Sequence, residues 1–302
     1  LMGPTASGKT DLAIALCKQF PCDIISVDSA LVYRGMDIGT AKPDAETLSR
    51  APHELINIRD PEDSYSAGDF VRDARQAIAA SFANNRVPLL VGGTMMYFRA
   101  LTQGIADLPA ADKDVREQID LQAQRGGWPA VHAELANVDP QAAARLNPND
   151  SQRIQRAIEV FRVSGKPLST WQSEASIDSD NTEFIKIALQ IEPREHLHQR
   201  IEQRLDGMIV DGFEAEVHRL RERPQLKRES TAMRSVGYRQ FWSYLEGDYS
   251  VEEARDRSLY ATRQLAKRQL TWLRSEKAVL SVAALETSAS ATIVSYLAQQ
   301  LA

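Results

Sequence analysis

The sequence contains few cysteines and no long apolar run. Its 302 residues include two cysteines, Cys17 and Cys22, which allow one disulfide at most and exclude a disulfide-stapled scaffold and a four-cysteine zinc site. We expect both to be buried, reduced thiols of a cytoplasmic protein. No stretch approaches the roughly 18 apolar residues of a membrane span, and the first residues carry no basic-then-apolar leader. Because the chain begins at Leu1, we expect a few residues to precede it in the natural protein.

An overall surplus of positive charge is also missing. The chain has 36 Lys and Arg against 41 Asp and Glu, a net charge of −5. This balance argues against a protein that coats nucleic acid with its whole surface, although local basic patches stay possible. The five histidines show no spacing typical of metal ligands, so we predict no histidine metal site.

The first part of the chain alternates between strand and helix patterns, without repeats or low-complexity tracts. The apolar runs CDIISVD and VPLLVGGT are typical of buried parallel strands, and Ser66 with Asp69 resembles a capping box that opens a helix. This alternation predicts a parallel sheet covered by helices. The expected strands lie at 22–28, 55–58 and 87–94, and the expected helices at 11–19 and 66–82.

Beyond residue 108 the alternation stops, and only helical patterns follow until about residue 164. We interpret residues 110–178 as an all-helical insertion domain in a core formed by 1–109 and 179–302, with Ser173–Thr182 as the return linker. The expected helices lie at 114–125, 128–136, 140–145, 150–164, 194–209, 212–222, 236–246, 250–275 and 288–300, and the expected strands at 184–191 and 278–282.

The chain opens on a glycine-rich motif. Gly3–Thr10, GPTASGKT, matches G-x-x-x-x-G-K-[ST], in which glycines let backbone N–H groups face phosphate oxygens. Lys9 supplies a positive charge, Thr10 a hydroxyl for Mg²⁺, and the following helix its positive N-terminal end. A glycine turn without ligand is the alternative, and the helix that follows directly argues against it. The motif predicts an α/β fold of the P-loop NTPase type, a parallel sheet flanked by helices.

An acidic residue and a hydroxyl residue at the ends of predicted strands indicate which chemistry takes place beside the glycine-rich motif. Asp28 and Thr94 follow predicted strands and fall on the same sheet edge as the motif, where ligands of open α/β sheets bind. We expect Asp28 to be a general base, with a capping or turn role as the alternative, and Thr94 could equally be a helix N-cap. Asp37 is a weaker base candidate. The run ending in Gly92-Gly93-Thr94 lacks the acid that an ATPase would use to hold its metal.

Basic residues gather in three segments of this acidic chain. Residues 219–239 and 255–277 each carry a net charge of +5, and Arg153 and Arg156 share one helical face opposite Ile154, Ile158 and Phe161. Such faces suit a polyanion, although each alone could be a solvated surface. Aromatic side chains among them could stack on unpaired bases or pack in the core: Tyr238, Trp242 and Trp272.

Six blocks in order along the chain resemble the tRNA dimethylallyltransferases, also called tRNA isopentenyltransferases. They are GPTASGKT at 3–10, DSALVYRGMDIGTAKP at 28–43, GGTMMYF at 92–98, QRIQR at 152–156, MRSVGYRQ at 233–240 and KRQLTWLR at 267–274. The resemblance implies transfer of a dimethylallyl group from dimethylallyl diphosphate to N6 of adenosine 37 in tRNAs reading codons that start with U. It also implies Mg²⁺, the tRNA anticodon stem-loop as partner, no membrane and a monomeric, cytoplasmic, bacterial-type member.

The resemblance assigns roles residue by residue. The implied catalytic residues are Asp28 as base, Thr94 near the leaving oxygen, and Lys9. The implied diphosphate or nucleotide contacts are Gly3, Pro4, Thr5, Ala6, Ser7, Gly8, Lys9 and Thr10, with Thr10 as metal ligand. The implied tRNA contacts are Asp28, Ser29, Ala30, Leu31, Thr94, Arg116, Gln152, Arg153, Ile154, Gln155, Arg156, Arg234, Ser235, Val236, Gly237, Tyr238, Arg239, Lys267, Arg268, Gln269, Leu270, Thr271, Trp272, Leu273 and Arg274.

Two other functions stay open at this stage. An ATP-dependent small-molecule kinase would use Asp28 to activate a hydroxyl, but it needs no basic stripes over three separated segments. An RNA-binding module with a nucleotide-sensing loop needs no acid at the strand end. Prenyl transfer uses all three features: a cradle for departing diphosphate, a base for the amine proton, and basic surfaces for an unpaired loop.

Overall fold

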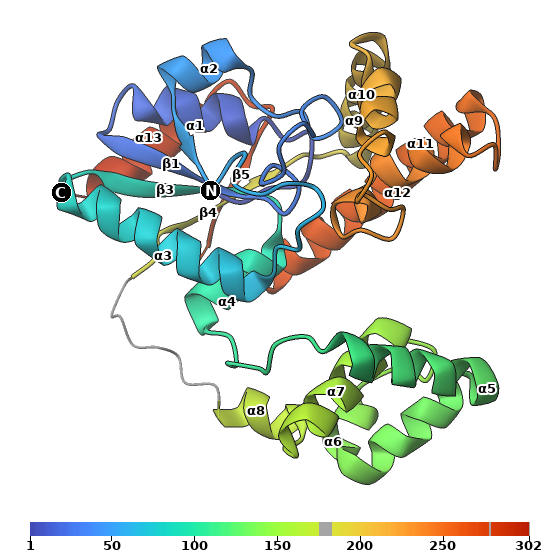
Figure 1. Ribbon diagram of the computed structural model, residues 1–302. Coiled ribbons are helices and arrows are strands. Elements are labelled where there is room, and N and C mark those ends of the chain that lie inside the picture. Colours follow the sequence, from blue (N-terminus) through green and yellow to red (C-terminus); the bar gives the residue numbers. More distant parts are fainter. Residues whose placement is uncertain (175–182, 278, 302) are drawn as a thin grey trace. The chain divides into compact units, whose positions relative to one another are not determined.

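The chain divides into two compact units. The computed structural model describes residues 1–174, 183–277 and 279–301 (Figure 1). One unit comprises Leu1–Leu101 and Glu183–Ala302, and the other comprises Thr102–Thr182. These limits lie eight residues before the expected start of the insertion and four after its expected end. The linker expected at Ser173–Thr182 falls, from residue 175 onward, outside the described residues.

A parallel sheet forms the centre of the first unit. Its strands are β1 (Cys22–Val27), β2 (His53–Glu54), β3 (Val87–Gly92), β4 (Lys186–Gln190) and β5 (Val279–Ala283). β1 pairs with both β2 and β3, and β4 pairs with β5, all in parallel. Met2 bridges Gly92 of β3 and Ala188 of β4, which joins the two groups into the order β2-β1-β3-Met2-β4-β5. The predicted P-loop-like α/β core is thereby confirmed.

Helices cover both faces of this sheet (Figure 1). Alternate residues of β1 point to opposite sides, so Ile25 packs with helix α3, whereas Ile24 packs with α1 and α13. The capping box predicted at Ser66 and Asp69 is present, with the Asp69 N–H donating to Ser66 Oγ at 3.1 Å. The helices of this unit are α1 (Lys9–Cys17), α2 (Ala45–Arg50), α3 (Ala67–Ala83), α4 (Met95–Gln103), α9 (Arg194–Val210), α10 (Phe213–Arg221), α11 (Tyr238–Leu245), α12 (Val251–Ser275) and α13 (Ala289–Gln300), with a 3₁₀ turn at Ala232–Arg234.

One predicted strand was wrong. Residues 55–58 form a turn, and the strand that pairs with β1 lies just before them at His53–Glu54. Leu55 and Asn57 have φ angles of 64° and 57°, which lie in the left-handed region and are incompatible with an extended strand. The apolar residues of this segment therefore belong to a turn, and Leu55 and Ile58 pack in the core from there.

The second unit contains only helices among its described elements. They are α5 (Lys113–Val138), α6 (Pro140–Ala143), α7 (Ser151–Ser164) and α8 (Leu168–Glu174). α5 kinks at Gly127, which has a φ of 75° and is followed by Pro129, so the two helices predicted at 114–125 and 128–136 are continuous except for this kink. Ile154 and Ile158 are fully buried in the unit's core, as their spacing predicted.

The described residues include no candidate membrane-spanning helix and no disulfide. No described helix combines the length and the apolar character needed to cross a bilayer. Cys17 and Cys22 are both free thiols. Cys22 is buried as predicted, whereas Cys17 is half-buried at the end of α1.

Candidate functional site

Three predicted segments meet at the carboxyl edge of the sheet. Gly92 pairs with both Met2 and Val27, so the residues that follow each of them emerge side by side. The Thr94 N–H donates to the Val27 carbonyl oxygen at 3.2 Å, and the Ser29 N–H donates to Thr94 Oγ1 at 3.1 Å. The structure therefore brings the glycine-rich loop, Asp28 and Thr94 together, as their strand-end positions suggested.

The glycine-rich loop curls around the ammonium group of its own lysine. Gly8 has a φ of 79° and directly precedes α1, while Ala6 also takes a left-handed φ of 61°. Lys9 Nζ donates to the Pro4 carbonyl oxygen at 2.6 Å and lies 3.5 Å from Ser7 Oγ. The first N–H groups of α1 have no acceptor within the helix, so the loop offers both amides and a cation to an anion.

A pocket of about 830 Å³ opens beside this loop. On its other side lie residues of α9, which the sequence reasoning missed. Arg200 Nε donates to the Ala6 carbonyl oxygen at 2.8 Å, and Arg204 Nη2 donates to the Thr40 carbonyl oxygen at 3.0 Å. Their spacing of four residues in HQRIEQR places both arginines on one helix face, a signal that could have identified them.

Two cations of this pocket, Lys9 and Arg204, are half-buried, whereas Arg200 is exposed. The pKa of Lys9 is lowered to about 8, mainly by burial and also by the charge of Arg204, while the charge of Asp28 acts in the opposite direction. Burial also lowers the pKa of the Arg204 guanidinium, again opposed by Asp28. Two neighbouring cations that have lost part of their hydration favour a bound anion, because the anion compensates both charges.

Asp28 directly follows β1, and its charge acts on both Lys9 and Arg204 of the pocket. It is half-buried, and its Oδ1 accepts the N–H groups of Ala30 at 2.8 Å and Leu31 at 3.3 Å. The capping role that we considered as an alternative is therefore real. It occupies one carboxylate oxygen and fixes the orientation of the other, so capping and proton transfer are compatible in one side chain.

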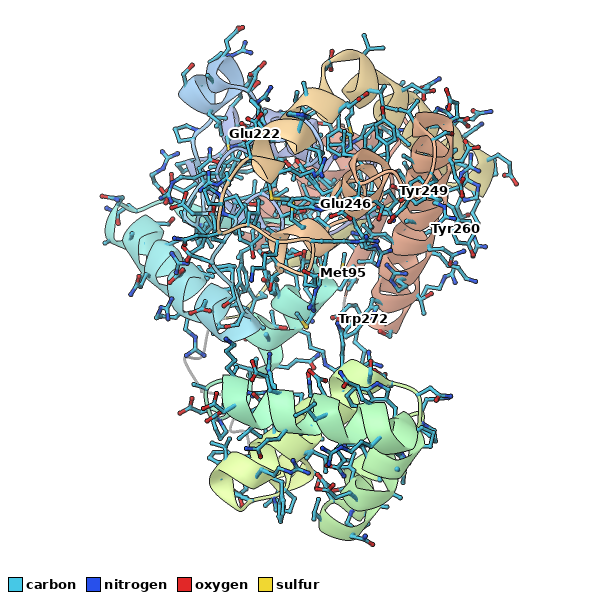
Figure 2. The ribbon with its side chains drawn as sticks, turned by 45° about the vertical axis from the view of Figure 1, so that its right-hand side comes forward. Met95, Glu222, Glu246, Tyr249, Tyr260 and Trp272 are labelled. Atoms are coloured by element: carbon cyan, nitrogen blue, oxygen red, sulfur yellow. The ribbon has the colours of Figure 1, made fainter. Side chains whose placement is uncertain are left out.

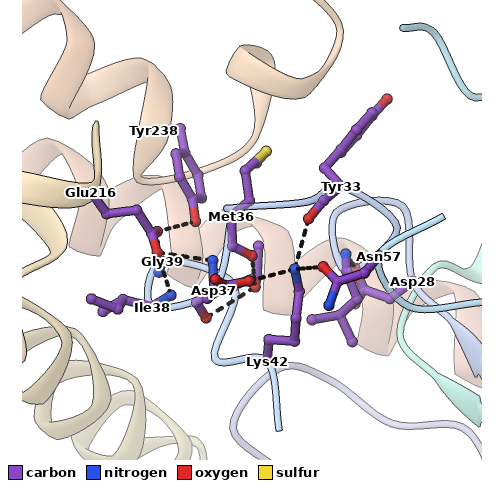
Figure 3. A network of polar contacts seen from close by, with 12 residues as sticks. Asp28, Tyr33, Met36, Asp37, Ile38, Gly39, Lys42, Asn57, Glu216 and Tyr238 are labelled. Carbon is purple, nitrogen blue, oxygen red and sulfur yellow. Dashed lines mark hydrogen bonds and ion pairs between the residues drawn. The ribbon is translucent and has the colours of Figure 1, made fainter. Parts of the chain in front are cut away.

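The segment after Asp28 is held by two buried charges (Figure 3). Lys42 Nζ donates to the Tyr33 carbonyl oxygen, to Asp37 Oδ1 and to Asn57 Oδ1 at 2.6–2.7 Å. The pairing of Asp37 with Lys42 argues against Asp37 as a base.

The second buried charge is Glu216 of α10. Its carboxylate accepts the N–H groups of Asp37, Ile38 and Gly39 at 2.8–3.1 Å and the hydroxyl of Tyr238 at 2.5 Å. Thr40 directly follows these three residues, and its carbonyl oxygen accepts a hydrogen bond from Arg204 Nη2.

Most of the predicted tRNA-contacting side chains are exposed or half-buried, but five residues are buried. The buried ones are Ile154, Gly237, Tyr238, Gln269 and Leu273, and their burial argues against side-chain contacts with RNA at these positions. The exposed ones are Ser29, Gln152, Arg153, Arg234, Arg239, Lys267, Arg268, Thr271 and Arg274, and the half-buried ones are Asp28, Ala30, Leu31, Thr94, Arg116, Gln155, Arg156, Ser235, Val236, Leu270 and Trp272.

Two of the three aromatic side chains belong to the core. Tyr238 is fully buried against Phe213, and Trp242 is 5% exposed and donates from Nε1 to Glu246 Oε1 at 2.8 Å. Of the two alternatives that the sequence left open, core packing therefore holds for both. Trp272 is half-buried, and the Arg99 guanidinium lies 5.6 Å from its ring centre.

In the second unit, a buried carboxylate orients two of the predicted RNA-contacting arginines. Glu159 is fully buried and accepts Arg116 Nε at 2.8 Å and Arg156 Nη1 at 2.7 Å. Burial acts to raise the pKa of Glu159, but the hydrogen bonds from both arginines hold it below its ordinary value. The single carboxylate of Glu159 thus holds the guanidinium groups of Arg116 and Arg156 in place, and one positive charge remains uncompensated among these three side chains.

Known proteins resemble the chain over nearly its whole length. The family model described as IPP transferase matches residues 31–276. A tRNA dimethylallyltransferase of Thiobacillus denitrificans is 53% identical over 303 residues, which cover 98% of this chain and 96% of that protein. One of Coxiella burnetii is 55% identical over 274 residues, which cover 91% and 88%.

Solved structures show the same similarity. The full-length tRNA isopentenylpyrophosphate transferase of Bacillus halodurans superposes with a TM-score of 0.72 at 35% identity, covering 99% of this chain and 95% of that one. A eukaryotic dimethylallyltransferase acting on tRNA gives a TM-score of 0.78 at 26% identity, covering 98% and 76%. The chain therefore belongs to the IPP transferase family.

Proposed function

We propose that this chain is a tRNA dimethylallyltransferase. It transfers the dimethylallyl group of dimethylallyl diphosphate to N6 of adenosine 37, in tRNAs reading codons that start with U, and gives N6-dimethylallyladenosine. Family membership supports the reaction class, and one observation of the site carries the assignment. The half-buried cations Lys9 and Arg204 line a pocket that suits an anion, and the charge of Asp28 at the same sheet edge acts on both of them.

The pocket suits a departing diphosphate. As the bond from C1 of the prenyl group to oxygen breaks, negative charge grows on the diphosphate, and Lys9, Arg204 and the amides at the start of α1 stabilise that charge. No nucleotide hydrolysis is needed. The Thr94 hydroxyl lies at the same edge, and we assign it to the side of the leaving oxygen.

The residues at the start of α1 also fit Mg²⁺. This ion prefers one or two protein oxygens together with phosphate oxygens, and Thr10 offers a hydroxyl in the pocket wall. Within the described residues no three His, Cys, Asp or Glu side chains gather into a metal-binding group, so the diphosphate would supply most of the remaining ligands. When bound, the ion would neutralise part of the charge of the diphosphate.

Asp28 supplies the base. The lone pair of an aromatic exocyclic amine is delocalised into the ring, so the amine needs alignment with C1 and an acceptor for its proton as the C–N bond forms. Oδ1 of Asp28 is occupied by its own turn, so we assign the proton to Oδ2. Adenosine 37 must leave its stack to reach this recessed edge, which explains the need for surfaces that hold an unpaired anticodon loop.

Incubation with labelled dimethylallyl diphosphate, Mg²⁺ and an anticodon stem-loop carrying A36-A37-A38 tests the proposal. We expect label in the RNA, at the mass of N6-dimethylallyladenosine after digestion, and none when adenosine 37 is replaced by guanosine. A parallel reaction with γ-labelled ATP and small hydroxyl compounds tests the kinase alternative. Phosphate transfer there, with unlabelled RNA in the first reaction, would contradict the proposal.

The lowered pKa of Lys9 predicts a pH dependence. Below about pH 8 the ammonium is charged and attracts diphosphate, and above pH 8 it loses its proton and this attraction. We therefore expect kcat/KM for dimethylallyl diphosphate to fall above about pH 8, by up to roughly tenfold per pH unit, because kcat/KM reports ionisations of the free enzyme. The Kd for the stem-loop serves as control and should not change there. A flat kcat/KM between pH 7 and 9.5 would show that Lys9 does not titrate in this range.

Exposed basic residues of both units should govern the salt dependence of RNA binding. We expect Arg153→Ala and Lys267→Ala each to weaken binding and to reduce the slope of log Kd against log salt by roughly 0.7–0.9, the share of one phosphate contact. Arg194→Ala is the matched control, since Arg194 is exposed at the start of α9 outside the predicted segments. Slopes equal to that of the unmodified chain would mean that these two faces are only solvated.

A further inference from the structure

Gln269 lies within the segment Lys267–Arg274, which resembles a tRNA-contacting segment, but its side chain faces inward. It is 8% exposed. Its Oε1 accepts the N–H of Thr5 at 2.9 Å, and its Nε2 donates to the Gly93 carbonyl oxygen at 2.8 Å. A single amide group thus uses both its acceptor and its donor to join α12 to two other segments, which lie 264 and 176 residues away in the chain.

Both partners of Gln269 belong to the proposed diphosphate site. Thr5 is part of the glycine-rich loop, and Gly93 directly precedes Thr94. The fit at Gly93 is close, since a Cβ added there would lie 2.5 Å from Gln269 Nε2 and 3.2 Å from the Gly3 carbonyl oxygen. Gln269 therefore fixes the distance between the loop that holds the diphosphate and the turn that carries Thr94.

The loop is held from two sides next to this contact. Ala6, which has the left-handed φ, packs on an apolar cluster that contains Ala266 and Leu270 of α12, and its carbonyl oxygen accepts Arg200 Nε. The Thr5 N–H is used by Gln269, so the diphosphate is left with the amides farther along, at the start of α1. This contact sets the conformation in which those later amides face the pocket.

The other face of α12 is basic and exposed. Lys267, Arg268 and Thr271 are exposed, whereas Ala266, Gln269 and Leu273 are buried, the spacing of a helix with two different faces. Trp272 lies beside the inner face, in a small cluster with Met95 at the start of α4 (Figure 2). Neighbouring residues of this helix therefore face different surroundings, solvent on one side and the packed sheet edge on the other.

We propose that Gln269 is a positioning residue of the diphosphate site and not an RNA contact. This inference rests on the proposed function. Glutamine suits the position because it offers an acceptor and a donor at once. Glutamate has no donor at neutral pH and would place a negative charge beside the Gly93 carbonyl oxygen and the diphosphate, whereas leucine would leave both partners without a hydrogen bond.

Two variants and one neighbouring control test this inference. Inorganic pyrophosphate is the probe for the site and is titrated by calorimetry with Mg²⁺, while stem-loop affinity is measured by fluorescence anisotropy. We expect Gln269→Leu to raise the Kd for pyrophosphate and the KM for dimethylallyl diphosphate by roughly tenfold, since two net hydrogen bonds are lost. Its stem-loop Kd should stay within about twofold. Lys267→Ala should give the opposite pattern.

Gln269→Glu is a second variant, which keeps the inference testable if Gln269→Leu folds poorly. It keeps the size and the acceptor, and circular dichroism would verify the fold of each variant. We expect it to bind pyrophosphate more weakly than Gln269→Leu does, because the added charge repels the ligand. Pyrophosphate affinity as in the unmodified chain for either variant, or a loss of stem-loop affinity like that of Lys267→Ala, would overturn the inference. An unmodified chain that fails to bind pyrophosphate would instead contradict the proposed function, and the inference with it.

Discussion

Asp28→Asn is expected to lower kcat for dimethylallyl transfer by about 10²–10⁴-fold, the usual contribution of a general base. Asparagine keeps an oxygen that can accept the N–H groups of Ala30 and Leu31, so the turn after β1 should persist. What is lost is the acceptor for the amine proton, which matters only as the C–N bond forms. The stem-loop Kd should therefore stay within about twofold. Single-turnover kinetics with saturating RNA and diphosphate separate the chemical step from binding.

Asp37→Asn is the matched control for this experiment. Asp37 carries the same charge in the same segment, but its carboxylate is exposed and paired with Lys42 at 2.7 Å. We expect its kcat to stay within about threefold, since asparagine keeps an oxygen that can accept the hydrogen bond from Lys42 Nζ. If Asp28→Asn instead lost RNA affinity and kept its turnover, Asp28 would be an RNA contact and not the base.

Glu216→Ala is expected to lower the free energy of unfolding by about 3–5 kcal/mol, because it leaves buried partners of a charged group unpaired. Glu216 is 2% exposed, and three consecutive backbone N–H groups and the Tyr238 hydroxyl all donate to it. Alanine would orphan all four donors and leave space beside Phe213 and Tyr238. Urea unfolding followed by circular dichroism measures the change.

Glu222→Ala provides the comparison on the same helix. Glu222 lies at the end of α10, has a side chain that is 67% exposed, and contacts His218 Nδ1 at 3.3 Å. We expect a loss of about 0–1 kcal/mol there. A loss for Glu216→Ala that is no larger than for Glu222→Ala would mean that the segment 37–39 is not held by this carboxylate.

The features that could be predicted from the sequence are local. The glycine-rich loop, the capping box at Ser66 and the apolar strands each occupy one short stretch, and the strand-end rule then places Asp28 and Thr94 beside the loop. The turn at 55–58 was missed because its apolar residues are typical of a strand, while the left-handed φ of Leu55 and Asn57 leaves no mark in hydrophobicity.

The groups that complete the site come from distant helices. Arg204 and Gln269 lie on α9 and α12, and Glu216 lies on α10, 164–264 residues from the backbone groups they bind. In the sequence each is one polar residue of an amphipathic helix, a pattern that equally fits a solvated surface. Only the packing of these helices against the sheet edge decides which polar residue faces inward.

We expect the glycine-rich loop and Arg204 to bind the diphosphate with its prenyl carbon toward Asp28. A crystal structure of the chain with the unreactive S-thiolodiphosphate analogue of dimethylallyl diphosphate tests it most directly. We predict diphosphate oxygens within hydrogen-bond distance of Lys9 Nζ, the amides at the start of α1 and the Arg204 guanidinium, with C1 on the side of the Asp28 carboxylate. Diphosphate bound away from Lys9 and Arg204, or C1 facing away from Asp28, would contradict the account.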